Sequence, residues 1–415
     1  MSKTLAEYNF FDPEVIEDPF EFYRVARHEA PVYLLPGSKP PTYLVTSFDL
    51  ISEALKDPYT FSNAFGAALQ GRAAYDPDVK AVSEKGWPQV DTLLTNDPPS
   101  HTRFRKLVNT AFTPGKVNRL EAYVADICDE LIDRFIDRGE CEFIEEFAVK
   151  LPVTVIADQL GVPREDWALF KRWSEAFVAR LGGMASKEEE LEGAQLVVDF
   201  QHYMIEKANE RRRDRREDIL SDLVHAQVDD ERPLDEGELL SILQQLLVAG
   251  NETTTNCLAG GLLLLIRNPE QMDRVRREPS LIRNMVEEIL RLESPTSGMW
   301  RVVKKDAELG GVNIPAGSML HLRYAAANRD PARFEDPEGF DPGRKNASVH
   351  LAFGRGTHMC VGAVLAKKEM TIAYTHLLRR LDNVRLAEGK NDLRHFPNML
   401  LRGLERLHIE FDRAS

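Results

Sequence analysis

The spacing of apolar residues predicts a chain made mostly of helices. Apolar positions recur every three to four residues, the period of a helix with one buried face, in the segments 20–29, 47–55, 117–138, 142–160, 164–182, 187–227, 281–292 and 361–380. Short runs of β-branched and aromatic residues occur at 41–46, 300–303, 312–314, 318–322 and in the tail 391–412. The pattern therefore predicts a mainly α fold with small β-sheets (α+β).

The longest helical pattern runs from Asp235 to Asn268, where Asn268-Pro269 ends it. Asp235 and Glu238 have the spacing of a capping box. Its middle, 249–255, is unusual, because a glycine, an acid and three threonines interrupt an apolar helix. Buried polar groups destabilise a fold unless they are paired, so this segment predicts a functional pocket. A threonine that bonds to the preceding turn and bends the helix is the structural alternative, and both readings are compatible.

Two segments before this helix carry candidate chemistry. Residues 60–95 are irregular and long, which is typical of a functional loop or of a disordered one; we favour a loop that faces a substrate. His101 and Arg105 are four residues apart and share one face of a helix. Two cationic groups on one face suit a buried pair of carboxylates, although a solvated basic helix has the same pattern.

A glycine-rich loop at 351–366 surrounds a single cysteine, Cys360. Gly354, Gly356 and Gly362 allow turns or close approaches that a Cβ would block. A cysteine just before a helix is in a position that favours a thiolate. A thiolate in such a loop, beside Phe353 and His358, suits an axial ligand of haem iron. A buried structural cysteine is the alternative that the loop alone leaves open.

Composition limits the other functions. The 53 basic and 67 acidic residues give a net charge of −14, which argues against general nucleic-acid binding. The four cysteines are scattered without a CxxC pair, so neither a disulfide framework nor a zinc site is expected. No signal peptide or membrane span is found, and we expect a soluble cytoplasmic protein. The basic run at 211–218 is interleaved with acids and predicts a solvated helix surface.

These features, in this order, resemble the cytochrome P450 superfamily, in particular its soluble bacterial members. Residues 353–362 match the family pattern Phe-Gly-x-Gly-x-His-x-Cys-x-Gly at every fixed position. Glu288 and Arg291 match the family's Glu-x-x-Arg pair, and Arg344 stands where its third member is expected. Residues 249–253 match the distal helix motif, with Glu252 where aspartate is commoner. The resemblance covers about 10–412.

The resemblance implies one P450 domain over 1–415, with the long helix over haem b and no fused reductase or ferredoxin module. Cys360 would ligate the iron, and Glu252 and Thr253 would deliver protons on the distal side. Glu288, Arg291 and Arg344 would form a buried structural network. The implied haem contacts are His101, Arg105, Arg301, Phe353, His358 and Cys360. The implied substrate pocket contains Gln245, Val248, Ala249, Ser297, Met299, Met399 and Leu400.

The implied reaction is insertion of one oxygen atom from O2 into a C–H bond of a hydrophobic molecule, terpenoid, aromatic or steroid-like. Electrons would come from a separate ferredoxin and its reductase to a monomeric enzyme. A local basic patch could dock the ferredoxin, or be a solvated face: Arg103, Lys106, Arg355, Lys367 and Lys368. Two alternatives are a peroxide-driven peroxygenase or fatty-acid decarboxylase, against which the Glu252–Thr253 pair argues, and a haem-based sensor, which no attached signalling domain supports.

Overall fold

The computed structural model describes residues 3–66, 76–181, 186–228 and 231–414. The chain divides into two compact units. Unit 1 contains residues 1–61, 118–152 and 252–415, and unit 2 contains residues 62–117 and 153–251. The prediction of one domain over 1–415 stays a prediction.

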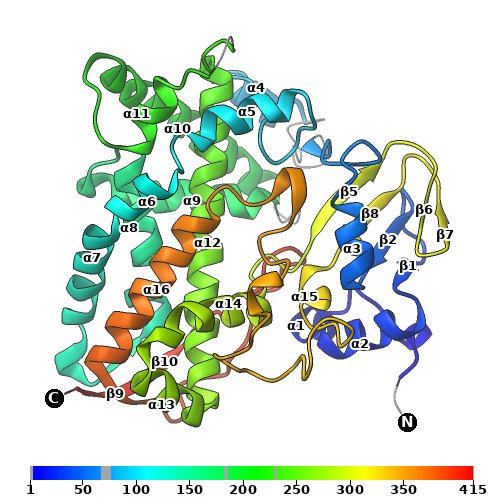
Figure 1. The fold of residues 1–415 in the computed structure, drawn as a ribbon. Helices are drawn as coiled ribbons and strands as arrows, with labels where there is room; N and C mark the ends of the chain where they lie inside the picture. Colours follow the sequence, from blue (N-terminus) through cyan, green and yellow to red (C-terminus); the bar gives the residue numbers. More distant parts are fainter. Residues whose placement is uncertain (1–2, 67–75, 182–185, 229–230, 415) are drawn as a thin grey trace. The chain divides into compact units, whose positions relative to one another are not determined.

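Unit 1 is built around a mixed sheet with the strand order β1-β2-β8-β5-β3. β2 and β8 are parallel, with Thr42 opposite Met319, and β5 and β8 are antiparallel, with Met299 opposite Leu322. Figure 1 shows α3 (Phe48–Ala54) beside this sheet. The sheet strands are β1 (Val32–Leu34), β2 (Thr42–Val45), β3 (Phe61–Ser62), β5 (Met299–Val303) and β8 (Met319–Leu322). A separate hairpin pairs β6 (Ala307–Leu309) with β7 (Val312–Ile314).

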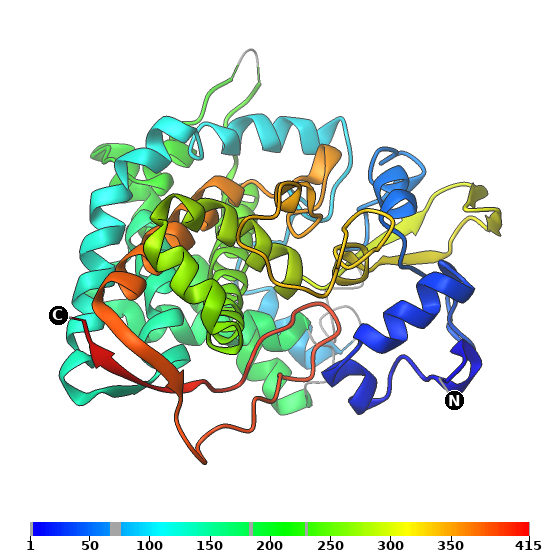
Figure 2. The ribbon, with the colours of Figure 1, turned by 60° about the horizontal axis from the view of Figure 1, so that its bottom comes forward.

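The helices of unit 1 pack mainly through α16 (Ala363–Arg380), which lies against α7 (Glu121–Asp133) and α14 (Ile282–Glu293). A second sheet has the strand order β4-β10-β9 and includes the last strand of the chain. Figure 2 shows β9 in orange and β10 in red. The strands of this sheet are β4 (Glu140–Glu142), β9 (Leu381–Leu386) and β10 (His408–Arg413). The remaining helices are α1 (Pro13–Glu17), α2 (Phe20–Glu29), α13 (Pro269–Arg277) and α15 (Tyr324–Ala327).

Unit 2 is helical and is organised by α10 (Lys187–Arg213), which packs on α4, α9 and α11. Ser186 and Glu189 begin α10 with a capping box, because each side chain bonds to the other's backbone N–H, at 3.2 and 2.7 Å. Trp173 of α9 is buried against Phe200 of α10, with ring centroids 5.5 Å apart. The helices of this unit are α4 (Pro77–Ser83), α5 (Ser100–Asn109), α9 (Trp167–Leu181), α10 and α11 (Ile219–Val224).

Three helices cross the boundary between the units: α6 (Pro114–Arg119), α8 (Lys150–Gln159) and α12 (Glu236–Arg267). α12 is continuous over its 32 residues, so the sequence prediction for 235–268 is confirmed to within one residue at each end. The predicted bend in its middle does not interrupt the helix.

Several predicted elements are wrong in extent; the helix expected over 117–138, for example, is divided, and α7 ends at Asp133. The helix expected over 187–227 ends at Arg213, because Asp214 is extended and Asp218 caps a new helix by accepting from Ser221 N at 2.7 Å. Arg211, expected on a solvated surface, is 3% exposed and bonds to Asp218 at 2.6 Å. Within the β-rich tail expected over 391–412 the structure has one regular strand, β10, which begins at His408; β9 ends at Leu386, before the tail, and a long connection joins the two strands. The helix α4 inside the 60–95 loop was not predicted; residues 67–75 of that loop lie outside the described residues.

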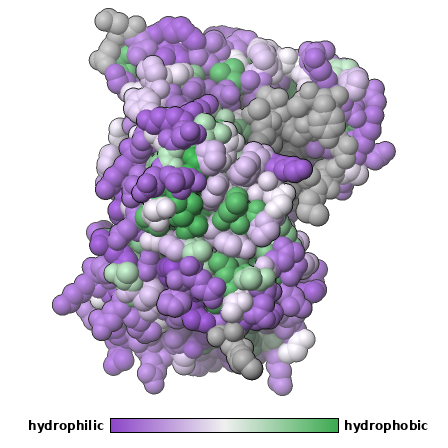
Figure 3. Space-filling model, turned by 90° about the vertical axis from the view of Figure 1, so that its right-hand side faces the viewer, coloured by the Kyte–Doolittle hydropathy of each residue, from purple (hydrophilic) through white to green (hydrophobic). Residues whose placement is uncertain are grey.

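The surface is mostly polar, with apolar side chains in small groups, as the face in Figure 3 shows. Among the described residues, the large apolar side chains that are exposed are Phe11, Leu34, Tyr59, Met359 and Val364. No helix in the described ranges has the length and apolar character needed to span a membrane.

Candidate functional site

The cysteine loop is a tight turn that leads directly into α16. Gly354 and Gly356 have φ of +65° and +70°, a conformation that side chains with a Cβ rarely adopt. At Gly356 a Cβ would also lie 2.7 Å from the Leu55 carbonyl oxygen. The backbone N–H of Cys360 donates to the Phe353 carbonyl at 2.9 Å. The loop therefore holds Cys360 three residues before the first turn of α16.

Cys360 differs from the other three cysteines, all of which lie in the described part of the chain. Cys128, Cys141 and Cys257 are buried, and burial raises the pKa of each thiol. Cys360 is exposed. A reactive or ligating cysteine needs this access, whereas buried apolar surroundings keep a thiol protonated and inert. The structural alternative of a buried cysteine is therefore wrong for Cys360.

The start of the loop is tied to α14 through Glu287. Its carboxylate contacts His350 Nε2 at 3.1 Å and Lys367 Nζ at 3.0 Å. Burial opposes ionisation of Glu287, but these two bonds outweigh it and lower its pKa. His350 Nδ1 in turn accepts from the N–H of Ala352 at 3.1 Å. α14, α16 and the cysteine loop are thereby connected by one polar chain.

Glu288, Arg291 and Arg344 form one buried ion-pair network in unit 1. Glu288 accepts from Arg291 at 2.7 and 2.8 Å and from Arg344 Nε at 2.8 Å. Arg291 also donates to the carbonyls of Asn328, Pro337 and Gly339, at 2.8, 2.6 and 3.0 Å. The network thus fixes the loop 328–344 against α14 through main-chain carbonyls.

The residues predicted to contact haem fall in both units. Arg301 and His358 belong to unit 1, and Arg301 is 3% exposed, with Nη1 donating to the Trp300 carbonyl at 2.7 Å. Burial raises the pKa of Tyr324, and the neighbouring Arg301 partly offsets this. His101 and Arg105 belong to unit 2, where α5 carries both. Burial and then the charge of Arg105 lower the pKa of His101.

The middle of α12 is uncovered on one side. Ala249 and Gly250 are exposed, although most residues toward either end of the helix are buried. A Cβ added at Gly250 would meet no atom within 4 Å. Glu252 and Thr253 are half-buried, whereas the hydroxyl of Thr255 donates to the Ala148 carbonyl at 3.0 Å. Ala249 and Gly250 are therefore the exposed residues in the middle of this helix.

Of the four predicted substrate-pocket residues in unit 1, Ser297 and Leu400 are in direct contact. The N–H of Ser297 donates to the Leu400 carbonyl at 2.7 Å, and the Ser297 carbonyl accepts from Ala325 at 3.0 Å. Met299 follows on β5, and Met399 precedes Leu400 in the turn 398–401. The structure thus joins the start of β5 to this turn.

The other three pocket residues, Gln245, Val248 and Ala249, lie on the unit 2 part of α12. Gln245 anchors the loop before α5, because its amide donates to Thr92 Oγ1 at 2.7 Å and accepts from Leu94 N at 3.1 Å. Val90 N adds a bond to Ser241 Oγ at 2.9 Å. This part of the 60–95 segment is therefore attached to the long helix.

The predicted basic patch is altered by ion pairs. Arg103 is largely buried and donates to Glu238 at 2.8 Å, so it does not contribute an exposed charge. Lys367 contacts Glu287, and Lys368 contacts Glu121 at 2.8 Å. Sequence alone could not show these partners, which are 80 and 247 residues away.

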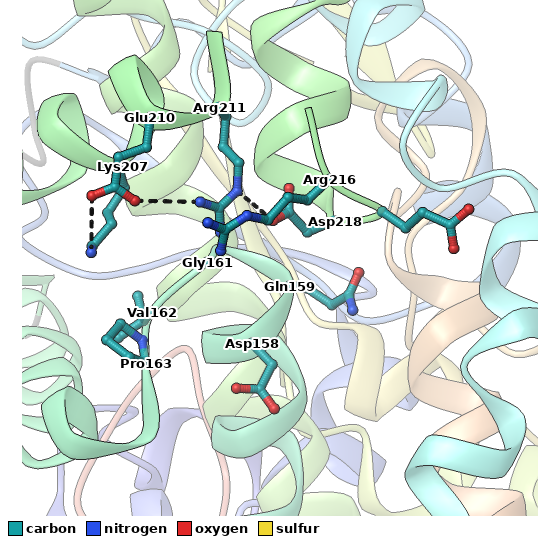
Figure 4. A pocket seen from close by; sticks show the side chains of 11 residues that line it. Asp158, Gln159, Gly161, Val162, Pro163, Lys207, Glu210, Arg211, Arg216 and Asp218 are labelled. Carbon is teal, nitrogen blue, oxygen red and sulfur yellow. Dashed lines mark hydrogen bonds and ion pairs between the residues drawn. The ribbon is translucent and has the colours of Figure 1, made fainter. Parts of the chain in front are cut away.

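A surface pocket of about 420 Å³ lies within unit 2 and contains none of the predicted haem, catalytic or substrate residues. Figure 4 shows Arg211 at its edge, paired with Asp218 and Glu210. Its lining consists of Asp158, Gln159, Gly161, Val162, Pro163, Lys207, Glu210, Arg211, Arg216, Glu217 and Asp218. Because its charges are of both signs and pair with one another, we assign it no ligand.

The possible metal-binding side chains, with Cys360 as the exposed cysteine, suit a haem better than a metal ion held by protein ligands alone. Within the described ranges, no three His, Cys, Asp or Glu side chains are grouped so that they could bind a metal. One exposed cysteine in a glycine loop suits a metal that brings its own planar ligand. This arrangement is typical of a cysteine-ligated haem protein.

Comparison with known proteins agrees with this class. Residues 184–409 match the family model for cytochrome P450. The chain is 36% identical over 410 residues to cytochrome P450 107B1 of Saccharopolyspora erythraea, covering 96% of each. It is 35% identical to the steroid C26-monooxygenase of Mycobacterium tuberculosis, covering 98% of this chain and 96% of that protein. The solved structure of CYP109Q5 from Chondromyces apiculatus aligns with a TM-score of 0.85 and 35% identity, over 99% of this chain and 100% of that one.

This chain belongs to the cytochrome P450 family. It is an oxidoreductase of the monooxygenase class, and its cofactor is haem b. The resemblance inferred from the motifs and the predicted mainly α fold with small sheets are both confirmed.

Proposed function

We propose that this enzyme hydroxylates neutral, hydrophobic small molecules of steroid-like, terpenoid or aromatic type, with Cys360 as the iron ligand. The observation that carries the proposal is the exposed Cys360 thiol at the start of α16, inside a turn that requires glycine. When bound, haem supplies the activation of O2 that allows one oxygen atom to enter a C–H bond.

The two haem propionates would be bound by Arg301, His358, His101 and Arg105. Phe353 would lie beside the cysteine. Their charges support this role, because buried carboxylates are costly without cationic partners. Arg301 and His101 are 3% and 2% exposed, so burial supports these two most directly. Glu288, Arg291 and Arg344 would support the loop 328–344 rather than take part in the chemistry.

Glu252 and Thr253 would control protons on the distal side. The Thr253 hydroxyl would hold a proton beside the reacting oxygen, and the Glu252 carboxylate would exchange protons with solvent. Their half-buried positions, next to the exposed Ala249 and Gly250, support this assignment. We do not assign this role to Thr255, because its hydroxyl donates a hydrogen bond to the Ala148 carbonyl.

The substrate class follows from the pocket residues and from relatives. Val248, Ala249, Met299, Met399 and Leu400 are apolar, as a pocket for a neutral hydrophobic ligand requires. One relative is named as a steroid C26-monooxygenase and another as 6-deoxyerythronolide B hydroxylase. CYP109E1 from Bacillus megaterium, a solved structure in complex with testosterone, aligns with a TM-score of 0.82 at 31% identity. These names favour polycyclic or macrocyclic substrates.

Electrons would come one at a time from a ferredoxin and its reductase. We further propose that the enzyme acts as a single-domain monomer in the cytoplasm. The lysines at the start of α16 support ferredoxin docking, because acidic partners associate faster with a basic surface. Lys368 is the more suitable of the two, since its partner Glu121 is 61% exposed and can be displaced at little cost.

Two measurements test the proposal. The reduced, CO-bound protein should show the red-shifted Soret band of thiolate ligation, and Cys360→His should shift it to the imidazole position. An imidazole-type spectrum of the unsubstituted protein would contradict the ligand assignment. A panel of steroids, terpenes, macrolides and fatty acids should give the low-to-high-spin shift with neutral polycyclic or macrocyclic members. A response to fatty acids alone would overturn the substrate class.

A further inference from the structure

A buried arginine lies behind the turn that carries two of the pocket residues. Arg323 follows β8, is 3% exposed, and its guanidinium donates to side chains of α2 and β8 and to a main-chain carbonyl of the turn 398–401. Arg323 is not among the residues that the sequence predicts for the haem, catalytic or substrate sites. Arg323 is therefore a charged group that the proposed function has not used.

The hydrogen-bond partners of Arg323 among the described residues are neutral. Nη1 donates to the Met399 carbonyl at 2.7 Å and to His321 Nε2 at 3.1 Å, and Nη2 donates to the hydroxyl of Tyr23. The guanidinium also lies 5.1 Å from the centre of the Tyr23 ring and 5.4 Å from that of Phe10. Within the described part of the chain, Arg323 forms no ion pair with a carboxylate, and its Nε is buried without a partner.

His321 acts as an acceptor in this cluster. Burial and then the charge of Arg323 hold the pKa of His321 well below its ordinary value, so its ring is neutral. Trp300 stacks on the ring at 3.9 Å between centroids and 17° between planes, which fixes its orientation. Arg323 is thereby locked between a stacked imidazole and a buried phenol.

The turn 398–401 is held from two sides. Arg323 binds the carbonyl of Met399, and the backbone N–H of Ser297 binds the carbonyl of Leu400 at 2.7 Å. Inside the turn, Asn398 Oδ1 accepts from the N–H groups of Leu400 and Leu401 at 2.8 and 3.0 Å. Met399 and Leu400 are therefore presented by main-chain bonds, and Arg323 supplies the one that comes from a side chain outside the turn.

A buried guanidinium without a carboxylate partner destabilises the fold, so its presence suggests that the charge has a role. A charged donor makes a shorter and stronger bond to a carbonyl than a neutral one. Such a bond on Met399 limits the motion of the turn and, with it, the positions of two pocket side chains.

We propose that Arg323 is a positioning residue that sets substrate selectivity and regioselectivity by fixing the turn 398–401. The proposal rests on the proposed function, since it assumes that Met399 and Leu400 face the substrate. Arg323 contacts no substrate itself and acts through the Met399 carbonyl.

Hydrogen–deuterium exchange tests the structural part without any turnover. Arg323→Met should speed exchange at the amides of Leu400 and Leu401 roughly tenfold, the effect of losing one bond worth about 1.4 kcal/mol. Arg27→Met is the matched control, because Arg27 also holds a backbone carbonyl, that of Ala326, at 2.9 Å. It should leave exchange at 398–401 unchanged. Unchanged exchange in Arg323→Met would overturn the proposal.

Product analysis tests the functional part with any substrate that the unsubstituted enzyme converts. Arg323→Met should raise KM about tenfold, change kcat less than about threefold, and broaden the ratio of hydroxylated products. Arg323→Lys should restore part of the product ratio, because one ammonium can still reach the Met399 carbonyl. An identical product ratio in Arg323→Met and Arg27→Met would contradict a role in selectivity.

The two tests separate this proposal from the proposed function. If the unsubstituted protein lacks the thiolate spectrum or converts no member of the panel, the proposed function fails while exchange still reports on Arg323. If Arg323→Met does not fold, Tyr23→Phe removes one neutral partner and should give smaller changes in the same direction. No change in exchange or product ratio in Tyr23→Phe and in Arg323→Lys would overturn the inference.

Discussion

Glu288 and Arg291 form a bidentate ion pair, at 2.7 and 2.8 Å, in which neither side chain is exposed to solvent. Their spacing of three residues places them on one face of α14. Removal of one partner leaves a buried charge without compensation, which is far more destabilising than the loss of an exposed pair.

Glu288→Gln should therefore lower the free energy of unfolding by about 3–5 kcal/mol. Glu21→Gln is the control, because Glu21 pairs with Arg24 at 2.5 Å with both side chains about half exposed. It should cost less than about 1 kcal/mol. Denaturant titration of both variants at equal haem content measures the difference. Equal losses of unfolding free energy would show that the buried Glu288 ion pairs stabilise the fold no more than an exposed pair does.

Thr253→Ala should keep NADH consumption but divert it into hydrogen peroxide, because the distal hydroxyl that holds a proton is lost. Thr255→Ala is the control two residues further along the helix. It removes the bond to the Ala148 carbonyl, so it should cost about 1 kcal/mol of stability and leave coupling intact. Simultaneous assays of NADH, peroxide and product check this. Full coupling in Thr253→Ala would remove Thr253 from the mechanism.

Lys368→Glu should slow ferredoxin-driven turnover several-fold at low salt and weaken its dependence on ionic strength, because rim charges act mainly on association. Lys390→Glu is the matched control, since Lys390 also pairs with an exposed glutamate, Glu140, at 2.6 Å. Turnover at increasing salt, with the spectrum of each reduced variant as a check, gives the comparison. Equal behaviour of the two variants would place docking elsewhere.

Glu369 predicts a pH-dependent stability. Burial raises the pKa of this carboxyl to about 8, and its Oε2 has no hydrogen-bond partner. The folded chain therefore holds a proton that the unfolded chain releases above about 4.5, so Glu369 reduces stability progressively between about pH 4.5 and 8. Glu369→Gln should match the unsubstituted protein near pH 4.5 and exceed it by a few kcal/mol near pH 8.

Denaturant titration of both proteins across this range measures the effect. A constant difference at all pH values would show that the Glu369 carboxyl does not titrate with folding.

Sequence predicted the elements whose signals are local. The helix 20–29 and the strand 312–314 match the structure at both ends, and α12 matches to within one residue, because periodicity, caps and proline act over a few positions. The glycine loop around Cys360 was recognisable for the same reason. These signals were sufficient to indicate the family.

Burial of single charges was not predictable, because it depends on partners far along the chain. Arg211 reads as one of several arginines in a polar run, yet it pairs with Asp218 once the helix ends at Arg213. Arg103 reads as part of a basic patch, yet Glu238 lies 135 residues away. Arg323 had one weak signal, an arginine at the end of the apolar strand Met319–Leu322.

The turn 398–401 is held through the main-chain carbonyls of Met399 and Leu400, and neither bond uses a side chain of these residues. Replacement of the two side chains should therefore leave the path of the backbone intact. Natural variation at these positions can alter which molecule is accepted without rebuilding the surrounding fold. Positions 399 and 400 are therefore suitable for saturation mutagenesis of substrate selectivity, provided that Arg323 and Ser297 are retained.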